Sequence, residues 1–512
     1  MLSYIECLIS LVLVILFALV FLHVSGKPRS KLVPPKVPPS PPRLPTIGNL
    51  HQLGKLPHQN LYKLSQKYGQ VMLLQLGRIP TIVISSPEMA KQILKTHDVD
   101  LCSRPESPGP RKLTYNLLDV AFSPFNDQWK ERRKILSFEL LNSKRSHTLW
   151  KFKREEVTTK LIESLSSEAS QKNTINVDEK MFQVMGEIIT SVAFGKCCND
   201  YQFKNGNHEL KDFLGEISEM LLTFCVEDYF PSILGRIIDA ILGHRSKLNN
   251  CFAKTDEYFS AILQDHIDKQ EASRGELQED LVDVMIRSSM DLSCHLSADH
   301  IKGMFLNIFL GGVDTSSNTI VWAMTELVRN QRVMKKVQDE IRSSIGIKEK
   351  LNGQDIEELK YLKMVVKETL RLHPAAPLLV PREAMHACEI DDNGNYYVIQ
   401  PKTRILVNAW AIARDPKSWK NPNEFYPERF EESDIDFKGT FFELLPFGSG
   451  RRICPGLKIS IMSMEFILTN LLYFFNWELP DGIKVEGVSL EEIGGITIHK
   501  KIPLSLKPVK YM

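Results

Sequence analysis

Residues 447–456 read FGSGRRICPG and place one cysteine, Cys454, between a glycine-rich loop and a strongly apolar segment. The apolar segment predicts a helix from about Leu457 to Phe475. Pro455 suits the first helical position, where no backbone N–H donor is needed. A sulfur atom at this end of a helix faces unpaired N–H groups and the positive end of the helix dipole. We therefore expect a lowered pKa for the Cys454 thiol.

A single thiolate narrows the choice of metals that this loop can hold. Structural zinc takes about four Cys or His ligands. No other cysteine occurs between residues 389 and 512, and the nearest histidine is His499. Haem iron needs fewer protein ligands, because the porphyrin supplies the equatorial ones, and Gly448 and Gly450 let the backbone approach a flat ligand. A buried structural cysteine is the alternative, and the ordered Phe, Gly, Arg and Gly around Cys454 argue against it.

A long helical pattern runs from Ser297, a good N-cap residue, to about Asn330. Its centre reads GGVDTS at residues 311–316, although each glycine inside a helix costs about 1 kcal/mol relative to alanine. A flat ligand against the backbone would explain that cost. Thr315 can donate its hydroxyl to the preceding turn and open the helix, and Asp314 adds an acid. The pair is a candidate proton relay to dioxygen, and a close helix crossing at these small residues is the alternative.

With these two motifs the chain resembles the cytochrome P450 family, and the wording of its motifs most resembles the large plant A-type group. FGSGRRICPG fits the family's haem-binding pattern at every fixed position, and the resemblance covers the whole chain. It implies a mainly α fold with small β-sheets and a haem b bound through the thiolate of Cys454. It also implies that Phe447 packs against the haem near the sulfur and that Arg452 pairs with a haem propionate. Thr315 and Asp314 are implied in oxygen activation.

Three further motifs offer donors for the haem propionates. WKERR at residues 129–133 places Trp129 and Arg133 four apart on a predicted helix, and both side chains donate hydrogen bonds suited to a carboxylate. The resembled family puts this pair on a propionate. Arg104, in SRP, and Arg382, in VPRE, match further propionate-contacting positions of the family. For each arginine, a solvated surface charge is the alternative.

The motifs KETLRLHP and FYPERF look like the family's K-helix and its partner segment. Glu368 and Arg371 lie three apart and share one helix face. Taken alone this spacing is weak evidence, because exposed helical ion pairs are common and contribute little. The resemblance implies a buried network of Glu368, Arg371 and Arg429 that supports the core on the haem side and has no catalytic role.

The first 26 residues predict a transmembrane anchor. Residues 7–24 contain no Asp, Glu, Lys or Arg over a length that spans a bilayer core. A cleaved signal peptide is the alternative, but residues 1–6 have no basic residue, and the basic residues follow the apolar run. This order predicts a single-pass protein of the endoplasmic reticulum membrane with a cytoplasmic catalytic domain. Residues 27–49, basic and rich in proline, predict a semi-rigid hinge or a docking peptide, and residues 50–512 predict one catalytic domain.

Composition and short patterns add limits to this interpretation. The chain of 512 residues is 43% hydrophobic and 25% charged, with a net charge of +2. This balance argues against a nucleic-acid partner and against a disordered protein. Residues 71–77 and 81–85 predict a β-hairpin. A second strand pair is expected from Tyr396 to Val407, after the turn signal Asp392-Asn393-Gly394.

The resemblance implies a monooxygenase that inserts one atom of dioxygen into a small lipophilic substrate and reduces the other to water. The chain shows no flavin or nicotinamide fingerprint, so NADPH is used indirectly, through a membrane-bound NADPH–cytochrome P450 reductase. The reductase is predicted to dock on a basic cluster formed by Arg132, Lys134, Lys144 and Arg145. The alternative is that these residues are simply charges exposed to solvent. A haem-thiolate isomerase or dehydratase that works without dioxygen and a non-enzymatic haem sensor are the other hypotheses, and the acid–threonine pair argues against both.

The resemblance also implies which segments line the substrate pocket, namely residues 113–122, 305–309, 375–380 and 493–496. These segments are mostly apolar, which favours a lipophilic plant specialised metabolite. A terpenoid is expected ahead of an alkaloid or a phenylpropanoid. Residues 226–243 are also apolar, and they either dip into the membrane and admit such substrates or belong to the core.

Overall fold

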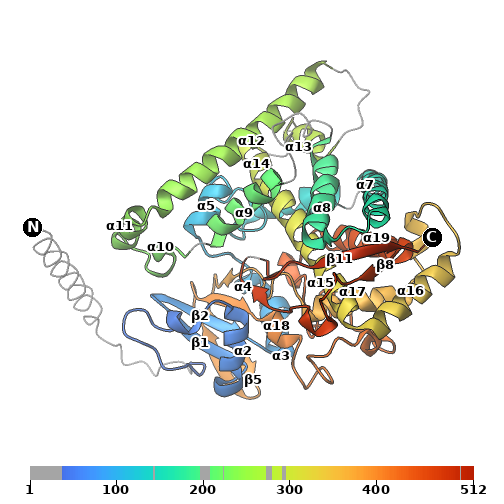
Figure 1. Ribbon diagram of the computed structural model, residues 1–512. Helices are drawn as coiled ribbons and strands as arrows, with labels where there is room; N and C mark the ends of the chain where they lie inside the picture. The colour runs from blue at the N-terminus through green and yellow to red at the C-terminus, as the bar shows by residue number, and fades with distance from the viewer. Residues whose placement is uncertain are drawn as a thin grey trace, which may run out of the picture.

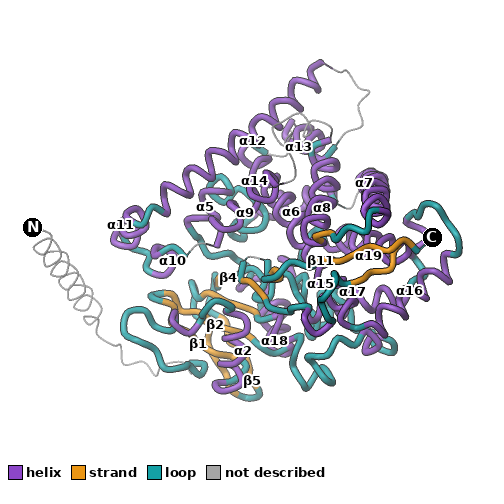
Figure 2. Tube along the Cα trace, viewed as in Figure 1, coloured by secondary structure: helices purple, strands orange, loops and turns teal. Residues whose placement is uncertain are grey.

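The computed structural model describes residues 37–141, 144–195, 208–222, 224–272, 280–290, 296–495 and 497–511. The predicted anchor and the first part of the predicted hinge, residues 1–36, lie outside them. Long helices fill one side of the molecule, and the N-terminal strands with α2 and α18 fill the other (Figure 1). The predicted fold class, mainly α with small β-sheets, is confirmed (Figure 2).

The helices follow one another in this order: α2 (Pro57–Tyr68), α3 (Pro87–Lys91), α4 (Asp98–Leu101), α5 (Pro108–Leu113), α6 (Asp127–Lys134), α7 (Lys144–Ser170), α8 (Val177–Ala193), α9 (His208–Leu222), α10 (Val226–Tyr229), α11 (Ile233–Ile241), α12 (His244–Ala272), α13 (Leu281–Met290), α14 (Ala298–Phe309), α15 (Thr315–Arg329), α16 (Gln331–Ile345), α17 (Lys360–Leu372), α18 (Ala409–Ile412) and α19 (Leu457–Phe474). Among the described helices, α19 alone is long and apolar enough to cross a membrane, and 67% of it is buried in the core.

The strands form small sheets: β1 (Val71–Leu76), β2 (Ile79–Ile84), β7 (Arg404–Val407) and β4 (Arg382–Glu383) in one; β3 (Ile175–Asn176), β11 (Ser505–Lys510) and β8 (Phe475–Glu478) in another; β5 (Cys388–Asp392) with β6 (Asn395–Ile399); and β9 (Glu492–Ile493) with β10 (His499–Lys500). The hairpin of β1 and β2 confirms the prediction. The second predicted pair is wrong in its partners. β6 pairs with β5 across the Asn393-Gly394 turn, and β7 lies parallel to β2.

The predicted long helix begins as expected and changes its winding halfway. Ser297 caps α14, because its hydroxyl accepts the N–H of His300 at 3.4 Å. A π-helical turn, η6 (Leu310–Asp314), then joins α14 to α15. Every residue from Ser316 to Val328 is buried, and α8, α17 and α19 pack around α15. This helix therefore carries its central polar residues through the main hydrophobic core.

The described part of the proline-rich segment packs on the sheet. The N–H of Leu73 in β1 donates to the carbonyl of Pro39 at 2.9 Å. The Asn49 side chain donates to the carbonyls of Pro41 and Pro42 at 3.4 and 3.3 Å. These bonds fix the direction in which the chain enters the folded body.

Candidate active site

One cavity of about 330 Å³ brings most of the sequence-predicted site residues together. Cys454 and Phe447 reach it from the loop before α19, and Thr315 reaches it from the start of α15. The four arginines predicted to bind propionates also line it: Arg104, Arg133, Arg382 and Arg452. Asp314 and Trp129 do not line it.

The backbone of the loop before α19 holds the cysteine in position. The N–H of Cys454 donates to the carbonyl of Phe447 at 3.0 Å. Gly450 has a φ of +71°, and a Cβ atom there would meet the carbonyl oxygen of Leu94 at 2.2 Å, so only glycine fits. α19 begins at Leu457 with Gly456 as its N-cap. The prediction that Pro455 takes the first helical position is therefore wrong, since the chain turns once more at Gly456.

Burial has the largest effect on the pKa of Cys454. Its enclosure raises the pKa of the thiol, while the N–H groups of Gly456 and Leu457 and the guanidinium of Arg133 act in the opposite direction. The predicted lowering of this pKa is not found, because desolvation outweighs the helix terminus. These neighbours nevertheless supply the hydrogen-bond donors that a thiolate needs. A metal ion bound to the sulfur would add the positive charge that stabilises the thiolate.

The π-turn η6 lines the cavity, and its two glycines, Gly311 and Gly312, have different surroundings. Thr315 Oγ1 donates to the carbonyl of Gly311 at 2.7 Å, as predicted from its position. Gly311 has open space on its Cβ side, whereas a Cβ on Gly312 would meet Cδ1 of Ile189 in α8 at 2.5 Å. Gly311 thus leaves room for a flat ligand, and Gly312 permits close packing of α8. Of the two interpretations made from the sequence, space for a flat ligand applies to Gly311 and close helix packing applies to Gly312.

Guanidinium groups crowd one end of this cavity. Arg452 donates to the backbone carbonyls of Cys102, Val120 and Ser123, and Arg104 donates to those of Ala121, Val380 and Pro381. Burial lowers the pKa of Arg452 to about 9 and holds the pKa of Arg104 well below its usual range, and repulsion from neighbouring guanidinium groups adds to both shifts.

Two more arginines complete this positive end. Arg382 donates to Asp98 at 2.6 Å and to the carbonyl of Ser449 at 3.0 Å. Arg133 donates to the carbonyl of Ile453. Buried cations of one sign are stabilised by an anion that accepts several N–H groups. The donor set therefore fits a flat ligand that carries carboxylates on one edge, as haem does.

A family model described as "Cytochrome P450" matches residues 38–504. The chain belongs to the cytochrome P450 family. It is 48% identical over 480 residues to "Cytochrome P450 71B10" of Arabidopsis thaliana, covering 92% of this chain and 93% of that protein. It is 45% identical to "2-methylbutanal oxime monooxygenase" of Manihot esculenta, covering 93% and 91%. A zebra fish cytochrome P450 solved with progesterone shares the fold, with a TM-score of 0.74 at 23% identity and coverage of 88% and 99%.

Membership of the P450 family gives this chain its cofactor and its reaction class. The protein is a monooxygenase, an oxidoreductase of plant metabolism that carries a haem with a cysteine thiolate ligand and receives electrons from a reductase. The resemblance to plant A-type P450s is confirmed by these relatives. In the described part of the chain, Cys454 is the cysteine that lines the cavity.

Trp129 lies behind the P450 cavity. Its indole Nε1–H donates to the carbonyl of Val120 at 2.9 Å, and its ring packs against the Arg452 guanidinium at 4.0 Å. The N–H predicted to reach a propionate is therefore engaged with the backbone, because the loop around Val120 folds over it. Trp129 therefore contacts Arg452 without lining the cavity itself.

The predicted K-helix network of the P450 fold is confirmed. Glu368 and Arg371 are fully buried. The Arg371 guanidinium donates twice to the Glu368 carboxylate, at 2.7 and 2.8 Å, and Arg429 donates to the same carboxylate at 3.0 Å. Arg371 also donates to the carbonyls of Ala413 and Pro422 at 2.7 Å. The network joins α17 to the segments that lead to the cysteine loop.

The structure corrects one member of the predicted reductase-docking cluster. Arg132 is buried and donates to the carbonyl of Asp119 and the hydroxyl of Ser123, so it is not part of a surface cluster. Lys134 is exposed. The side chains of Lys144 and Arg145 lie outside the described residues.

The predicted pocket segments differ in what they contribute. The cavity is lined from three of them, by Val120 and Ala121, by Asn307 and Ile308, and by Ala375, Ala376, Leu379 and Val380. The fourth contributes no lining residue among its described members. Ile493 is 52% exposed because it pairs with His499 at the edge of a two-stranded sheet. Ile496 lies outside the described residues.

Asn307 is a lining residue that the sequence analysis did not single out. Its Oδ1 accepts the N–H groups of Val120 and Ala121 at 2.9 and 3.0 Å, and its Nδ2 donates to Asp119 at 2.9 Å. The signal in the sequence is a single amide within the apolar run FLNIF. Asn307 fixes the loop that forms one wall of the cavity.

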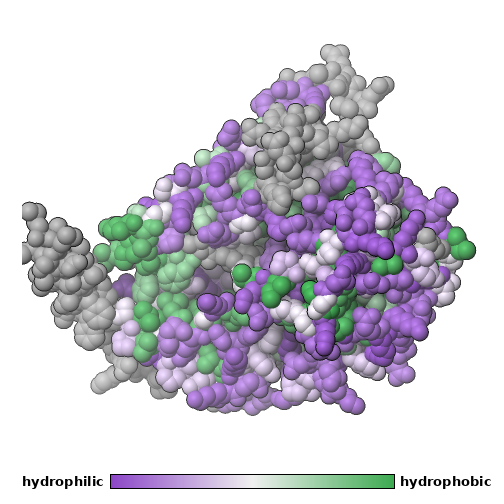
Figure 3. All heavy atoms as spheres, viewed as in Figure 1, coloured by the Kyte–Doolittle hydropathy of each residue, from purple (hydrophilic) through white to green (hydrophobic). Residues whose placement is uncertain are grey.

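The apolar segment 226–243 is not core. Helix α11 exposes most of its large apolar side chains: Ile233, Leu234, Ile237, Ile238 and Ile241. They gather in one green patch at the left edge of the molecule in Figure 3, where Figure 1 labels α11. An exposed apolar patch of this kind marks an interaction site.

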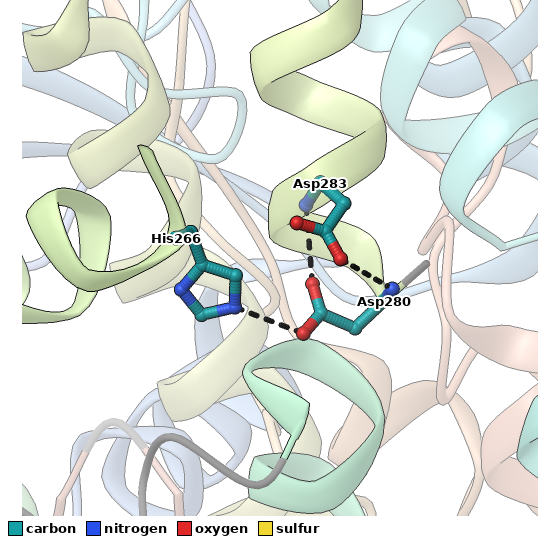
Figure 4. Close-up of side chains that lie close together, drawn as sticks. All are labelled: His266, Asp280 and Asp283. Carbon is teal, nitrogen blue, oxygen red and sulfur yellow. Dashed lines mark hydrogen bonds and ion pairs between the residues drawn. The ribbon is translucent and has the colours of Figure 1, made fainter. Parts of the chain in front are cut away.

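A second group of titratable residues lies away from the cavity, where α12 approaches α13. His266, Asp280 and Asp283 are close enough to hold a metal ion (Figure 4). His266 Nε2 bonds to Asp280 at 2.9 Å, however, and Nδ1 bonds to the carbonyl of Ile262 at 2.8 Å. Since both ring nitrogens are engaged within the protein, the group is a buried tie between two helices.

Proposed function

We propose that this P450 hydroxylates or otherwise oxidises a lipophilic plant specialised metabolite, with a terpenoid as the expected class. The observation that carries the proposal is that Cys454 and Thr315 line one cavity whose other walls are mostly apolar. The balanced reaction is RH + O2 + NADPH + H⁺ → ROH + H2O + NADP⁺. The bound haem supplies the oxygen chemistry.

The chain's own residues hold that cofactor and manage protons. Cys454 is the proposed iron ligand, and Phe447 packs beside it, with its ring 5.8 Å from that of Phe437. Arg104, Arg133, Arg382 and Arg452 are the proposed partners of the propionates. Thr315 presents its hydroxyl at the cavity, and Asp314 is the adjacent acid. The presence of this acid–threonine pair argues against an isomerase or dehydratase that works without dioxygen.

An aldoxime is the second candidate substrate. Two relatives at 44% and 45% identity are named as oxime monooxygenases, from Sorghum bicolor and Manihot esculenta. Asn307 and Thr319 are polar residues on the cavity wall: the second N–H of the Asn307 amide is a donor for an oxime, and the Thr319 hydroxyl, which donates to the carbonyl of Thr315, is an acceptor for the oxime O–H. The rest of the cavity wall is mostly apolar, which favours a terpenoid substrate over an aldoxime.

The experiment that tests the proposal uses the full chain in microsomes with NADPH–cytochrome P450 reductase. Limonene, geraniol and 2-methylbutanal oxime are supplied in turn, with and without dioxygen. We expect product that requires both NADPH and dioxygen, and an oxygen atom from ¹⁸O2 in each terpenoid product. Product formed equally well without dioxygen would favour the isomerase alternative.

Replacing Thr315 by alanine is expected to uncouple NADPH use from product. A hydrogen bond of this kind contributes about 1 kcal/mol, so product per NADPH should fall about five- to tenfold. Thr315→Ser, which keeps the hydroxyl, is the matched control and should retain most of the coupling. Unchanged coupling in Thr315→Ala would remove Thr315 from oxygen activation.

We propose that the protein sits in the endoplasmic reticulum membrane through residues 1–26, with α11 dipping into the same bilayer. The exposed apolar face of α11 supports this orientation. In lipid nanodiscs, backbone amides of α11 should exchange hydrogen more slowly in the wild type than in an Ile233→Asp, Ile241→Asp variant. Amides in the middle of α12 serve as the control and should not differ. Equal exchange of the α11 amides would contradict the proposal.

A further inference from the structure

Asp314 and Thr315 are adjacent in sequence, but their side chains point in different directions. Thr315 lines the cavity, whereas Asp314 does not. The Asp314 carboxylate instead meets His499 of β10, with Nε2 at 3.1 Å from Oδ1 and 3.3 Å from Oδ2. The side chain of His499 is 40% exposed and that of Asp314 is 12% exposed. An acid next to the cavity is thus joined to solvent through one imidazole.

The position of His499 does not depend on this ion pair. The carbonyl of Ile498, the preceding residue, accepts the side chains of Asn318 and Trp322 in α15 at 2.8 and 3.3 Å. The N–H of Ile498 donates to the carbonyl of Ala375 at 3.0 Å. These bonds hold β10 against the helix. Because the strand is already anchored and the imidazole is partly exposed, the pair itself adds little to stability.

The chemistry of imidazole suggests a different role. Histidine is the side chain whose charge changes near neutral pH, and the monooxygenase reaction consumes protons. We propose that His499 is a positioning residue that passes protons from solvent to Asp314. This inference rests on the proposed roles of Asp314 and Thr315. In the step, the Nε2–H bond of the protonated imidazole breaks and the proton joins the Asp314 carboxylate, which leaves a neutral imidazole. A hydronium ion from solvent then protonates the imidazole again and leaves water, and no oxidation state changes.

Several charges around His499 tune this exchange. Burial lowers the pKa of His499, and the positive charge of Lys211 in α9 also lowers it. The hydrogen bond to Asp314 and the negative charges of Asp314 and of Asp178 in α8 raise it. The net result is a pKa above the ordinary value for histidine. His499 is therefore protonated over more of the neutral range than a free histidine. We expect product per NADPH to be highest at low pH and to fall as pH rises through this pKa.

The test compares His499→Gln with the wild type, each as full-length holoenzyme with reductase and the best substrate of the panel above. Glutamine keeps a hydrogen bond to Asp314 but has no group that gains or loses a proton near neutral pH. Product per NADPH should fall about tenfold, less than the 10²- to 10⁴-fold that a general acid at the reacting atoms contributes, and its decline with pH should vanish. His386→Gln is the matched control, because His386 also pairs with a carboxylate, Asp100, at 3.1 Å on the surface; it should behave as the wild type.

A second arm separates proton supply from structure. With an alkyl hydroperoxide the reaction is RH + R′OOH → ROH + R′OH, which consumes no protons, so His499→Gln should retain wild-type yield. Equal losses in both reactions, or unchanged coupling with NADPH, would overturn the proposal. Failure of the proposed function would look different, since the wild type itself would form no product that depends on NADPH and dioxygen.

A third measurement needs no turnover. Exchange of the imidazole C2 hydrogen, followed by mass spectrometry of the peptide containing His499, gives the pKa of His499 in the intact protein. Asp314→Asn should lower this pKa, because it removes the negative charge that raises it. A pKa that does not change would show that the two groups are not coupled and would overturn the inference.

Discussion

Replacing Cys454 by alanine is expected to abolish the red-shifted carbon monoxide band of the reduced protein and to reduce product below detection. Cys454 lines the cavity and is the proposed iron ligand, and a thiolate ligand pushes electron density onto iron. The measurement is the carbon monoxide difference spectrum of the full-length protein, normalised to total protein, together with turnover of the substrate panel.

Two further variants make this result specific. Cys388→Ala removes a buried cysteine of β5 that does not line the cavity, so its spectrum should match that of the wild type. Cys454→His keeps a ligand for iron but not a thiolate, and it should bind haem without the red-shifted band. A red-shifted band that persists in Cys454→Ala would assign the iron ligand to another residue.

Replacing Arg371 by methionine is expected to lower the free energy of unfolding by roughly 3–5 kcal/mol, because it leaves the Glu368 carboxylate buried with one partner removed. The carbonyls of Ala413 and Pro422 lose their donor at the same time. Urea unfolding of the full-length protein in detergent, followed by tryptophan fluorescence, measures the loss. The yield of haem-loaded protein should fall with it.

Arg332→Met is the matched control for this prediction. Arg332 also pairs with a glutamate, Glu428, but its side chain is 60% exposed. Exposed pairs contribute at most about 1 kcal/mol, so the variant should unfold close to the wild type. If Arg371→Met were as stable as Arg332→Met, the buried network would not support the core.

The sequence predicted features that depend on local chemistry. The cysteine loop, the cap at Ser297 and the back-bonded hydroxyl of Thr315 all depend on residues a few positions apart, and the structure has each of them. The prediction that Pro455 takes the first helical position is wrong by two residues, because the geometry of Gly456 sets the loop-to-helix junction and the helix begins at Leu457.

Features that depend on distant contacts could not be predicted in this way. β7 pairs on one side with β2, which lies far earlier in the chain, and on the other side with β4. Arg132 is buried by Asp119 and Ser123 only because the loop between α5 and α6 folds over α6. His499 meets Asp314 because two-stranded β9 and β10 dock on α15, and no spacing in the sequence indicates that contact.

The π-turn at Leu310–Asp314 also sets the rotational phase between the two halves of the long helix. An α-helix advances about 100° per residue, so the wider π-turn offsets the downstream half relative to the upstream one. Asn307 and Ile308 upstream and Thr315 downstream line the cavity, whereas Asn318 donates to the carbonyl of Ile498, next to β10. Substitutions upstream of the turn therefore change the cavity wall without rotating the downstream residues. Deletion of a single residue from the turn would rotate them all away from their partners.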